Sequence, residues 1–112
     1  MEKLVSKVAG LGVPGLILVV AISATGLAGG AAITTALAAI GPGGMIGGIV
    51  TLGVIALLSE GLTEYGFDAI FTGVVKELYK RGENKASILR KIEKYPVSKG
   101  LKRKLKEELE KV

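Results

Sequence analysis

The stretch VAGLGVPGLILVVAISATGLAGGAAITTALAAIGPGGMIGGIVTLGVIALLS, residues 8–59, runs for 52 residues without a charged side chain. A helix needs about 20 apolar residues to cross the hydrocarbon core of a bilayer. A soluble chain of 112 residues would have to bury this run on all sides with only short charged flanks. The stretch therefore predicts an all-α integral membrane protein.

The composition around this stretch points to helix packing in lipid and away from catalysis. Aromatic residues make up 4% of the chain, whereas glycine occurs 17 times. Small residues let helices approach closely in lipid, where packing replaces the hydrophobic drive. Cysteine and histidine are both absent. We therefore expect no disulfide framework, no thiolate or histidine chemistry, no cofactor and no metal site.

The apolar stretch divides at the turn signal Gly41-Pro42-Gly43-Gly44. Pro14 suits the first turn of a helix, and the second apolar block predicts one helix that continues through Ser59–Phe71. The favoured arrangement is a two-span hairpin, formed by Pro14–Ile40 and Gly43–Leu62. The alternative has three shorter helices, with bounds Pro14–Ala28, Ala31–Ile40 and Met45–Leu62; its middle helix would be re-entrant or buried among neighbouring helices, which requires oligomerisation.

The charges are concentrated in the C-terminal third. Residues 76–112 contain 13 Lys or Arg against 6 Glu, which gives this part a charge of +7. The rest of the chain is slightly acidic, so the net charge of the whole chain is +5. A basic flank marks the cytoplasmic side of a membrane protein and attracts anionic headgroups. We therefore expect both termini in the cytoplasm, and the cell membrane as the location in a prokaryote. Three glutamates interrupt the basic run without interleaved aromatics, which argues against nucleic acid: Glu107, Glu108 and Glu110.

Four segments follow from these patterns. They are an interfacial lead (1–9), a transmembrane Gly/Ala-rich region (10–62), a helix extension that leaves the membrane (63–82) and a basic cytoplasmic helical tail (83–112). In the tail, helical spacing predicts a helix over Ala86–Tyr95 and a second helix with an apolar stripe at Leu101, Leu105 and Leu109. The two helices form a helix-turn-helix pair whose stripes face each other, the bilayer or a soluble partner.

Glycines at small-xxx-small spacing predict close helix packing in the apolar region. The candidate packing residues are Gly26, Gly30, Gly43, Gly44, Gly47 and Gly48. Such pairs favour association of separate chains, and we expect a homo-oligomer. The alternative is packing of the hairpin against itself.

Three carboxylates follow the apolar stretch at helical spacing. Glu60, Glu64 and Asp68 stand at i, i+4 and i+8, which places them on one face of a continuous helix. In a symmetric assembly they would line a cation-attracting vestibule. The alternative is an ordinary hydrated helix end at the headgroups. Tyr65, Phe67 and Phe71 fit interfacial anchors beside them.

The segment TGLAGGAAITTALAAIGPGGMIGGIVTLGVIALL (Thr25–Leu58) resembles the core of the interferon-alpha-inducible small membrane proteins. The similarity lies in three short motifs: Gly26-Leu27-Ala28, Ala38-Ala39-Ile40 and Gly43-Gly44-Met45-Ile46-Gly47-Gly48. The resemblance implies a membrane location, a tendency to associate, and a role in immunity or membrane perturbation. It supplies no catalytic residues.

These patterns predict a non-enzymatic, self-associating membrane protein. Its most specific form is a membrane-perturbing or pore-forming assembly of the toxin or defence type. The alternative is a membrane anchor or scaffold whose basic tail recruits a soluble protein. A dedicated ion channel subunit is a third class, and it depends on the acidic residues alone.

Overall fold

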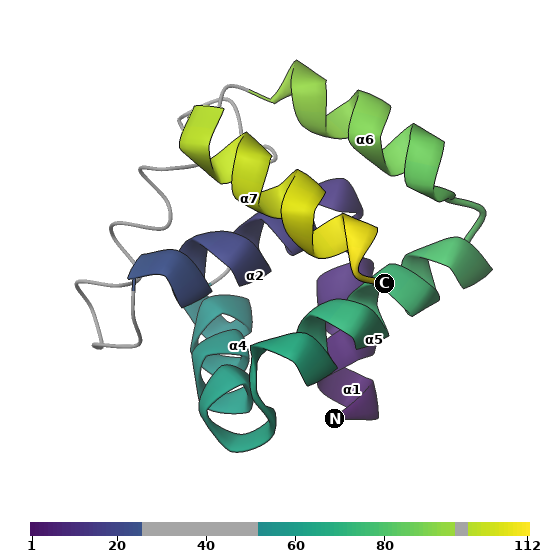
Figure 1. The fold of residues 1–112 in the computed structure, drawn as a ribbon. Helices are drawn as coiled ribbons and strands as arrows, with labels where there is room; N and C mark the ends of the chain where they lie inside the picture. Colours follow the sequence, from purple (N-terminus) through teal and green to yellow (C-terminus); the bar gives the residue numbers. More distant parts are fainter. Residues whose placement is uncertain (26–51, 96–98) are drawn as a thin grey trace.

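The computed structural model describes residues 1–25, 52–95 and 99–112, and the regular elements within these ranges are α-helices. This confirms the all-α prediction for the described part of the chain. The elements, labelled in Figure 1, are α1 (Glu2–Ala9), α2 (Val13–Thr25), α4 (Leu52–Tyr65), α5 (Phe67–Lys80), α6 (Lys85–Lys94) and α7 (Lys99–Glu110).

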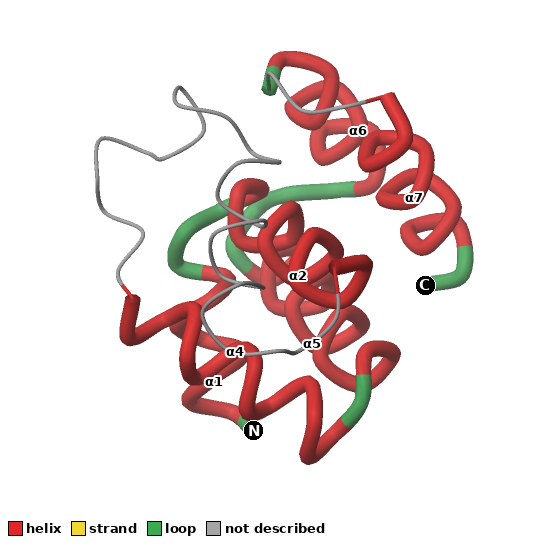
Figure 2. Tube along the Cα trace, turned by 90° about the vertical axis from the view of Figure 1, so that its left-hand side faces the viewer, coloured by secondary structure: helices red, strands yellow, loops and turns green. Residues whose placement is uncertain are grey.

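Helix α2 is the centre of the molecule. Residues 13–22 are all buried, and from Leu16 to Ile22 no residue is more than 1% exposed. The helix contacts α1, α4, α5, α6 and α7, and it lies between the α6–α7 pair and the α1–α4 pair (Figures 1 and 2). A helix that is apolar on every side belongs in a core or in a membrane. Here protein covers it, and Pro14 lies in its first turn as predicted.

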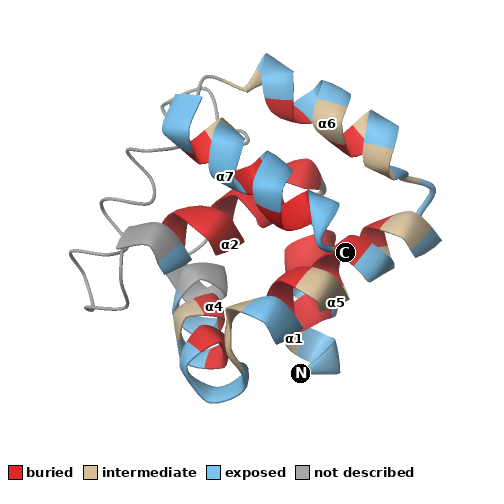
Figure 3. Cartoon of the chain, in the orientation of Figure 1, coloured by how far each residue is buried: buried red, intermediate tan, exposed pale blue. Residues whose placement is uncertain are grey.

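The helices α1, α5, α6 and α7 are buried on one side only, as Figure 3 shows. Their apolar residues recur every three or four positions, so each helix has one stripe that faces inward and charged residues that face water. The inward residues of α5, α6 and α7 are Ile70, Phe71, Val74, Val75, Leu78, Ile88, Ile92, Leu101, Leu105 and Leu109. These residues join those of α1 and α2 in one core, so the tail packs on the apolar region.

Two glycines let α1 lie directly against its neighbours. A Cβ on Gly15 of α2 would stand 2.2 Å from the carbonyl oxygen of Val8, so the two backbones touch there. A Cβ on Gly61 of α4 would stand 2.1 Å from Cδ2 of Leu4. Small residues thus permit close helix packing within this single chain.

The prediction of one continuous helix through Ser59–Phe71 was wrong. Helix α4 ends at Tyr65, and α5 begins at Phe67 after Gly66, whose φ is +88° and ψ is 159°. L side chains rarely adopt this conformation, so glycine permits the sharp change of direction. The turn allows α5 to pack on α1 and α2. Phe71 is consequently a core residue at 2% exposure and stacks on Phe67, with 5.3 Å between ring centroids.

Within the described ranges, no single helix has both the length and the apolar character needed to cross a bilayer. Helix α1 and residues 13–23 of α2 meet these requirements only as a pair, and their axes are bent by 117°. The choice between the two-span hairpin and the three-helix arrangement falls on residues 26–51, which lie outside the described part of the chain.

Candidate functional site: an apolar helix under a basic cover

The helices α6 and α7, here called the basic cover, lie over α2. The stripe of α7 is buried within the chain: Leu101 is 8% exposed, Leu105 0% and Leu109 2%. It packs against α2 and α6, and α6 adds Ile88 and Ile92 from its own inner face. The stripe was predicted to face the other tail helix, the bilayer or a soluble partner, and in the structure it packs against the chain itself. A partner would have to displace α2 to reach it.

The outer side of the basic cover has a cleft of about 400 Å³ between α6 and α7. We call it the basic cleft, and its lining consists of Glu93, Lys99, Lys102, Arg103 and Lys106. Four cations therefore meet one carboxylate. Concentrated positive charge of this kind attracts anions and raises their local concentration.

Glu93 occupies the basic cleft as an internal anion. Its carboxylate is ion-paired with Lys106 and lies 3.9 Å from Nζ of Lys102, which also donates a hydrogen bond to the Glu93 carbonyl oxygen at 3.2 Å. The hydrogen bond from Lys106 and the charges of Lys106 and Lys102 hold the pKa of Glu93 below its ordinary value. These contacts tie α6 to α7. Lys99 and Arg103 form no ion pair with another described residue.

The start of α6 is fixed by a capping box. The Asn84 side chain accepts a hydrogen bond from the Ser87 backbone at 2.8 Å, and the Ser87 hydroxyl accepts one from the Asn84 backbone at 2.9 Å. Glu83 adds an ion pair with Lys91 and accepts a hydrogen bond from the Ser87 hydroxyl. The bonds from Lys91 and Ser87 lower the pKa of Glu83. This network sets the position of α6 over the core.

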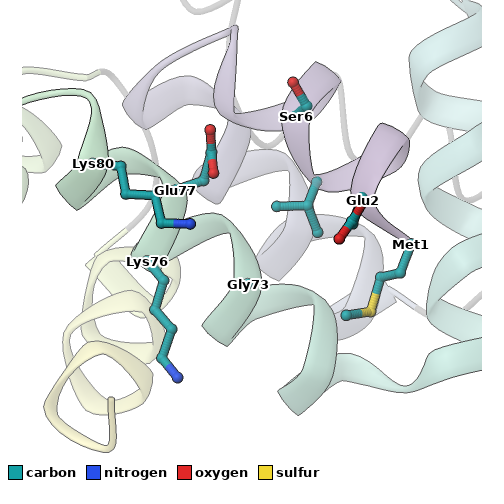
Figure 4. A pocket seen from close by; sticks show the side chains of 8 residues that line it. Met1, Glu2, Ser6, Gly73, Lys76, Glu77 and Lys80 are labelled. Carbon is teal, nitrogen blue, oxygen red and sulfur yellow. The ribbon is translucent and has the colours of Figure 1, made fainter.

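A second hollow, of about 440 Å³, lies between α1 and α5 (Figure 4). Its lining mixes the carboxylates Glu2 and Glu77 with two lysines of α5. The hydroxyl of Ser6 in this groove accepts a hydrogen bond from Nη2 of Arg81 at 3.2 Å, and Nε of Arg81 pairs with Glu77 at 3.4 Å. Arg81 thus ties the end of α5 to α1. We assign this groove a structural role.

The predicted acidic face is divided between two helices. Glu60 and Glu64 are exposed on α4, whereas Asp68 is exposed in the first turn of α5, beyond the turn at Gly66. The expectation of three carboxylates along one helix was therefore wrong, because Gly66 changes the chain direction between the second and the third. The six candidate packing glycines, Gly26, Gly30, Gly43, Gly44, Gly47 and Gly48, lie outside the described part of the chain.

No sequence pattern predicted the basic cleft. Its central pair joins Glu93 to Lys106 across two helices and the residues between them, so no local spacing indicates it. Glu108 was also missed: it is 6% exposed and pairs with Lys104 at 3.5 Å and Lys111 at 3.2 Å. Here the i, i+4 spacing of Lys104 and Glu108 was a usable signal. In the described ranges, no group of three or more acidic residues is placed to hold a metal ion.

Comparisons with known proteins found no matching family model, no matching curated protein and no matching solved structure. The resemblance of Thr25–Leu58 to the interferon-alpha-inducible small membrane proteins therefore stays a prediction.

Proposed function

We propose that this chain is a non-enzymatic membrane protein that self-associates in the bilayer. The apolar region that begins with α2 is the inserting element, as a hairpin with both termini on the cytoplasmic side. The basic cover lies at the anionic headgroups. A membrane-perturbing assembly is the most specific form of this proposal.

The observation that carries the proposal is the uniform apolar character of α2. Its residues from Leu16 to Ile22 have no polar side and are buried, and α2 contacts the apolar residues of five neighbouring helices. Lipid tails are about as apolar as leucine side chains. Helix α2 can therefore exchange protein for lipid with a small change in free energy, whereas exposure to water would be costly.

The same reasoning applies to the basic cover. Burial of a leucine side chain contributes about 1.5–3 kcal/mol, so the stripe of α7 contributes roughly 5–9 kcal/mol to its contact with the core. Exposed ion pairs contribute far less. The apolar stripe therefore decides whether α7 stays on α2. Water offers the stripe no alternative, but a bilayer does.

The buried stripe also weighs against the scaffold alternative. A soluble partner that binds Leu101, Leu105 and Leu109 would first have to expose α2, because these leucines cover it. A membrane covers both the leucine stripe and the exposed surface of α2 with hydrocarbon. A single soluble partner would need a matching apolar groove to do the same.

The test uses the absence of tryptophan from the chain. Leu18→Trp places a fluorophore on α2, and Ala69→Trp places one at an exposed position of α5. With vesicles whose acyl chains carry bromine, we expect quenching for Leu18→Trp and little for Ala69→Trp. Retention on membranes after an alkaline carbonate wash provides a second measurement. Unquenched fluorescence at Leu18→Trp, together with release by carbonate, would refute the proposal.

A further inference from the structure

We infer that the basic cleft between α6 and α7 is a binding site for the phosphate of anionic lipid headgroups. When it binds, the phosphate replaces the Glu93 carboxylate between Lys102 and Lys106; we call this replacement the exchange. The inference rests on the proposed membrane function and names the part of the chain that meets the membrane surface.

The cleft contains more cations than the Glu93 carboxylate pairs with. Four cations face the single carboxylate of Glu93, and Lys99 and Arg103 are left without an ion pair among the described residues. The phosphodiester of a lipid headgroup carries one negative charge on two unesterified oxygens, and a guanidinium matches it with two parallel hydrogen bonds. A headgroup phosphate can therefore engage Arg103 together with the lysines that now hold Glu93.

The exchange is easy because the present ion pair is open to water. The side chains of Glu93 and Lys106 are 51% and 48% exposed. Exposed pairs of this kind are weak and are screened by salt. Glu93 can thus leave the cleft without exposing a buried charge.

The position of the cleft identifies lipid as the source of the phosphate. Lys102, Arg103 and Lys106 share two turns of α7 with the buried residues Leu101 and Leu105. A bilayer offers phosphate to the cations and hydrocarbon to the leucines within the reach of one helix. Free phosphate or nucleic acid meets only the first of these requirements.

Loss of the Glu93 contacts also weakens the tie between α6 and α7. With Lys102 and Lys106 on headgroups, the leucine stripe is the main described contact that holds α7 to the core. The stripe can then move from α2 into the bilayer, which uncovers α2 at the membrane surface. Binding at the cleft and exposure of α2 are therefore coupled.

The first experiment measures partition of the full chain onto vesicles of phosphatidylcholine, with and without phosphatidylglycerol. Lys99→Gln with Arg103→Gln removes two cleft cations that hold no ion pair, and Arg90→Gln with Lys94→Gln removes two exposed cations of α6 outside the cleft. Each cation near an anionic surface adds to the attraction, so both pairs should lower partition onto anionic vesicles, and we expect the cleft pair to lower it about threefold or more beyond the control pair. Equal losses would overturn the inference.

The second experiment removes the internal anion. Glu93→Gln vacates the space between Lys102 and Lys106 and adds one unit of net charge. Glu110→Gln adds the same unit at an exposed position outside the cleft. We expect Glu93→Gln to strengthen binding to anionic vesicles several-fold more than Glu110→Gln. If both changes strengthen binding equally, overall charge explains the effect and the exchange is refuted.

The third experiment follows the leucine stripe with a single introduced thiol. This is possible because the chain has no cysteine of its own. The thiol of Leu105→Cys should be protected from a maleimide in buffer, with neutral vesicles and with inorganic phosphate, and should become reactive on anionic vesicles. Lys104→Cys, exposed on the same helix, should react throughout. Leu109→Cys tests the same stripe at a second position if circular dichroism shows that Leu105→Cys unfolds the chain.

The outcomes separate this inference from the proposed function. If the Leu18→Trp variant is quenched by lipid while the cleft variants bind like their controls, the cleft assignment fails and the membrane function stands. If the Leu105→Cys thiol reacts with the maleimide in inorganic phosphate alone, a soluble anion is the ligand and the assignment to lipid headgroups is refuted. Binding of short RNA through the cleft cations, without binding to vesicles, would refute both.

Discussion

At the scale of single residues, Gly15 is a position where a side chain would meet the backbone of another helix. A Cβ there would stand 2.2 Å from the carbonyl oxygen of Val8, which belongs to the backbone and cannot rotate away. We expect Gly15→Ala to lower the free energy of unfolding by about 1–3 kcal/mol, because α1 must shift from α2. Urea denaturation followed by circular dichroism measures this change.

The matched control for Gly15→Ala is Gly100→Ala in α7. A Cβ on Gly100 has no atom within 4 Å, so the same substitution meets open space. Alanine favours a helix over glycine by about 1 kcal/mol, so this variant should be equal to the natural chain or slightly more stable. If both variants lose the same stability, the close contact of α1 and α2 is refuted.

At the scale of elements, α6 depends on charge at its N-terminal end. The bonds from Lys91 and Ser87 hold the pKa of Glu83 below its ordinary value of 4.5. A carboxylate with a lowered folded pKa stabilises the fold above the unfolded value, and this contribution disappears as the pH falls through the folded value. We therefore expect Glu83→Gln to be less stable than the natural chain at pH 7, and the difference to vanish progressively below about pH 4.5.

The measurement is the free energy of unfolding against pH for both chains. Glu107→Gln is the control, because Glu107 is exposed and forms no ion pair with a described residue. A stability difference for Glu83→Gln that persists at low pH would show that the amide itself, and not the lost ion pair, perturbs the helix.

Helical periodicity predicted the cover helices well. The expected helix Ala86–Tyr95 is α6 at Lys85–Lys94, because Ile88 and Ile92 give a clear inward stripe. The break at Gly66 could not be predicted in the same way. Gly61 and Gly73 lie inside helices α4 and α5, so a lone glycine in an apolar helical pattern does not indicate by itself where the chain turns.

At the scale of the whole molecule, the apolar run determined that α2 is buried but not what buries it. Protein and hydrocarbon provide equally apolar surroundings, so hydropathy cannot distinguish them. The deciding features are tertiary: the stripe of α7 meets α2, and Lys106 reaches Glu93 on another helix. The basic cleft was therefore beyond prediction from local sequence patterns, although the basic charge of the tail was evident.

Self-association should depend on the small residues of the apolar region. Gly30→Leu and Gly47→Leu add bulk at positions where the sequence predicts contact between helices, so each should reduce the mass of the detergent-solubilised assembly without preventing membrane insertion. Light scattering after size-exclusion chromatography measures that mass. Gly100→Leu adds the same bulk where the surroundings are open and should leave it unchanged.

If the mass is the same for all three variants, the glycines of the apolar region serve turns or packing within one chain. Gly15 and Gly61 already have such a role against α1.

The acidic residues distinguish a pore from an assembly that does not conduct ions. Glu60 and Glu64 share α4, next to the apolar region, whereas Asp68 belongs to α5 beyond the turn at Gly66. Repetition of α4 around an assembly would gather the two glutamates at the mouth of a pore and attract cations. We therefore expect Glu60→Gln with Glu64→Gln to reduce cation leakage from liposomes while the assembly keeps its mass. Asp68→Asn should change leakage little, because its helix takes a different direction.

Equal effects of the two changes would point to general surface charge. Liposomes that release neither ions nor dye with any of these chains would exclude the pore and leave a self-associating membrane protein without a conducting path.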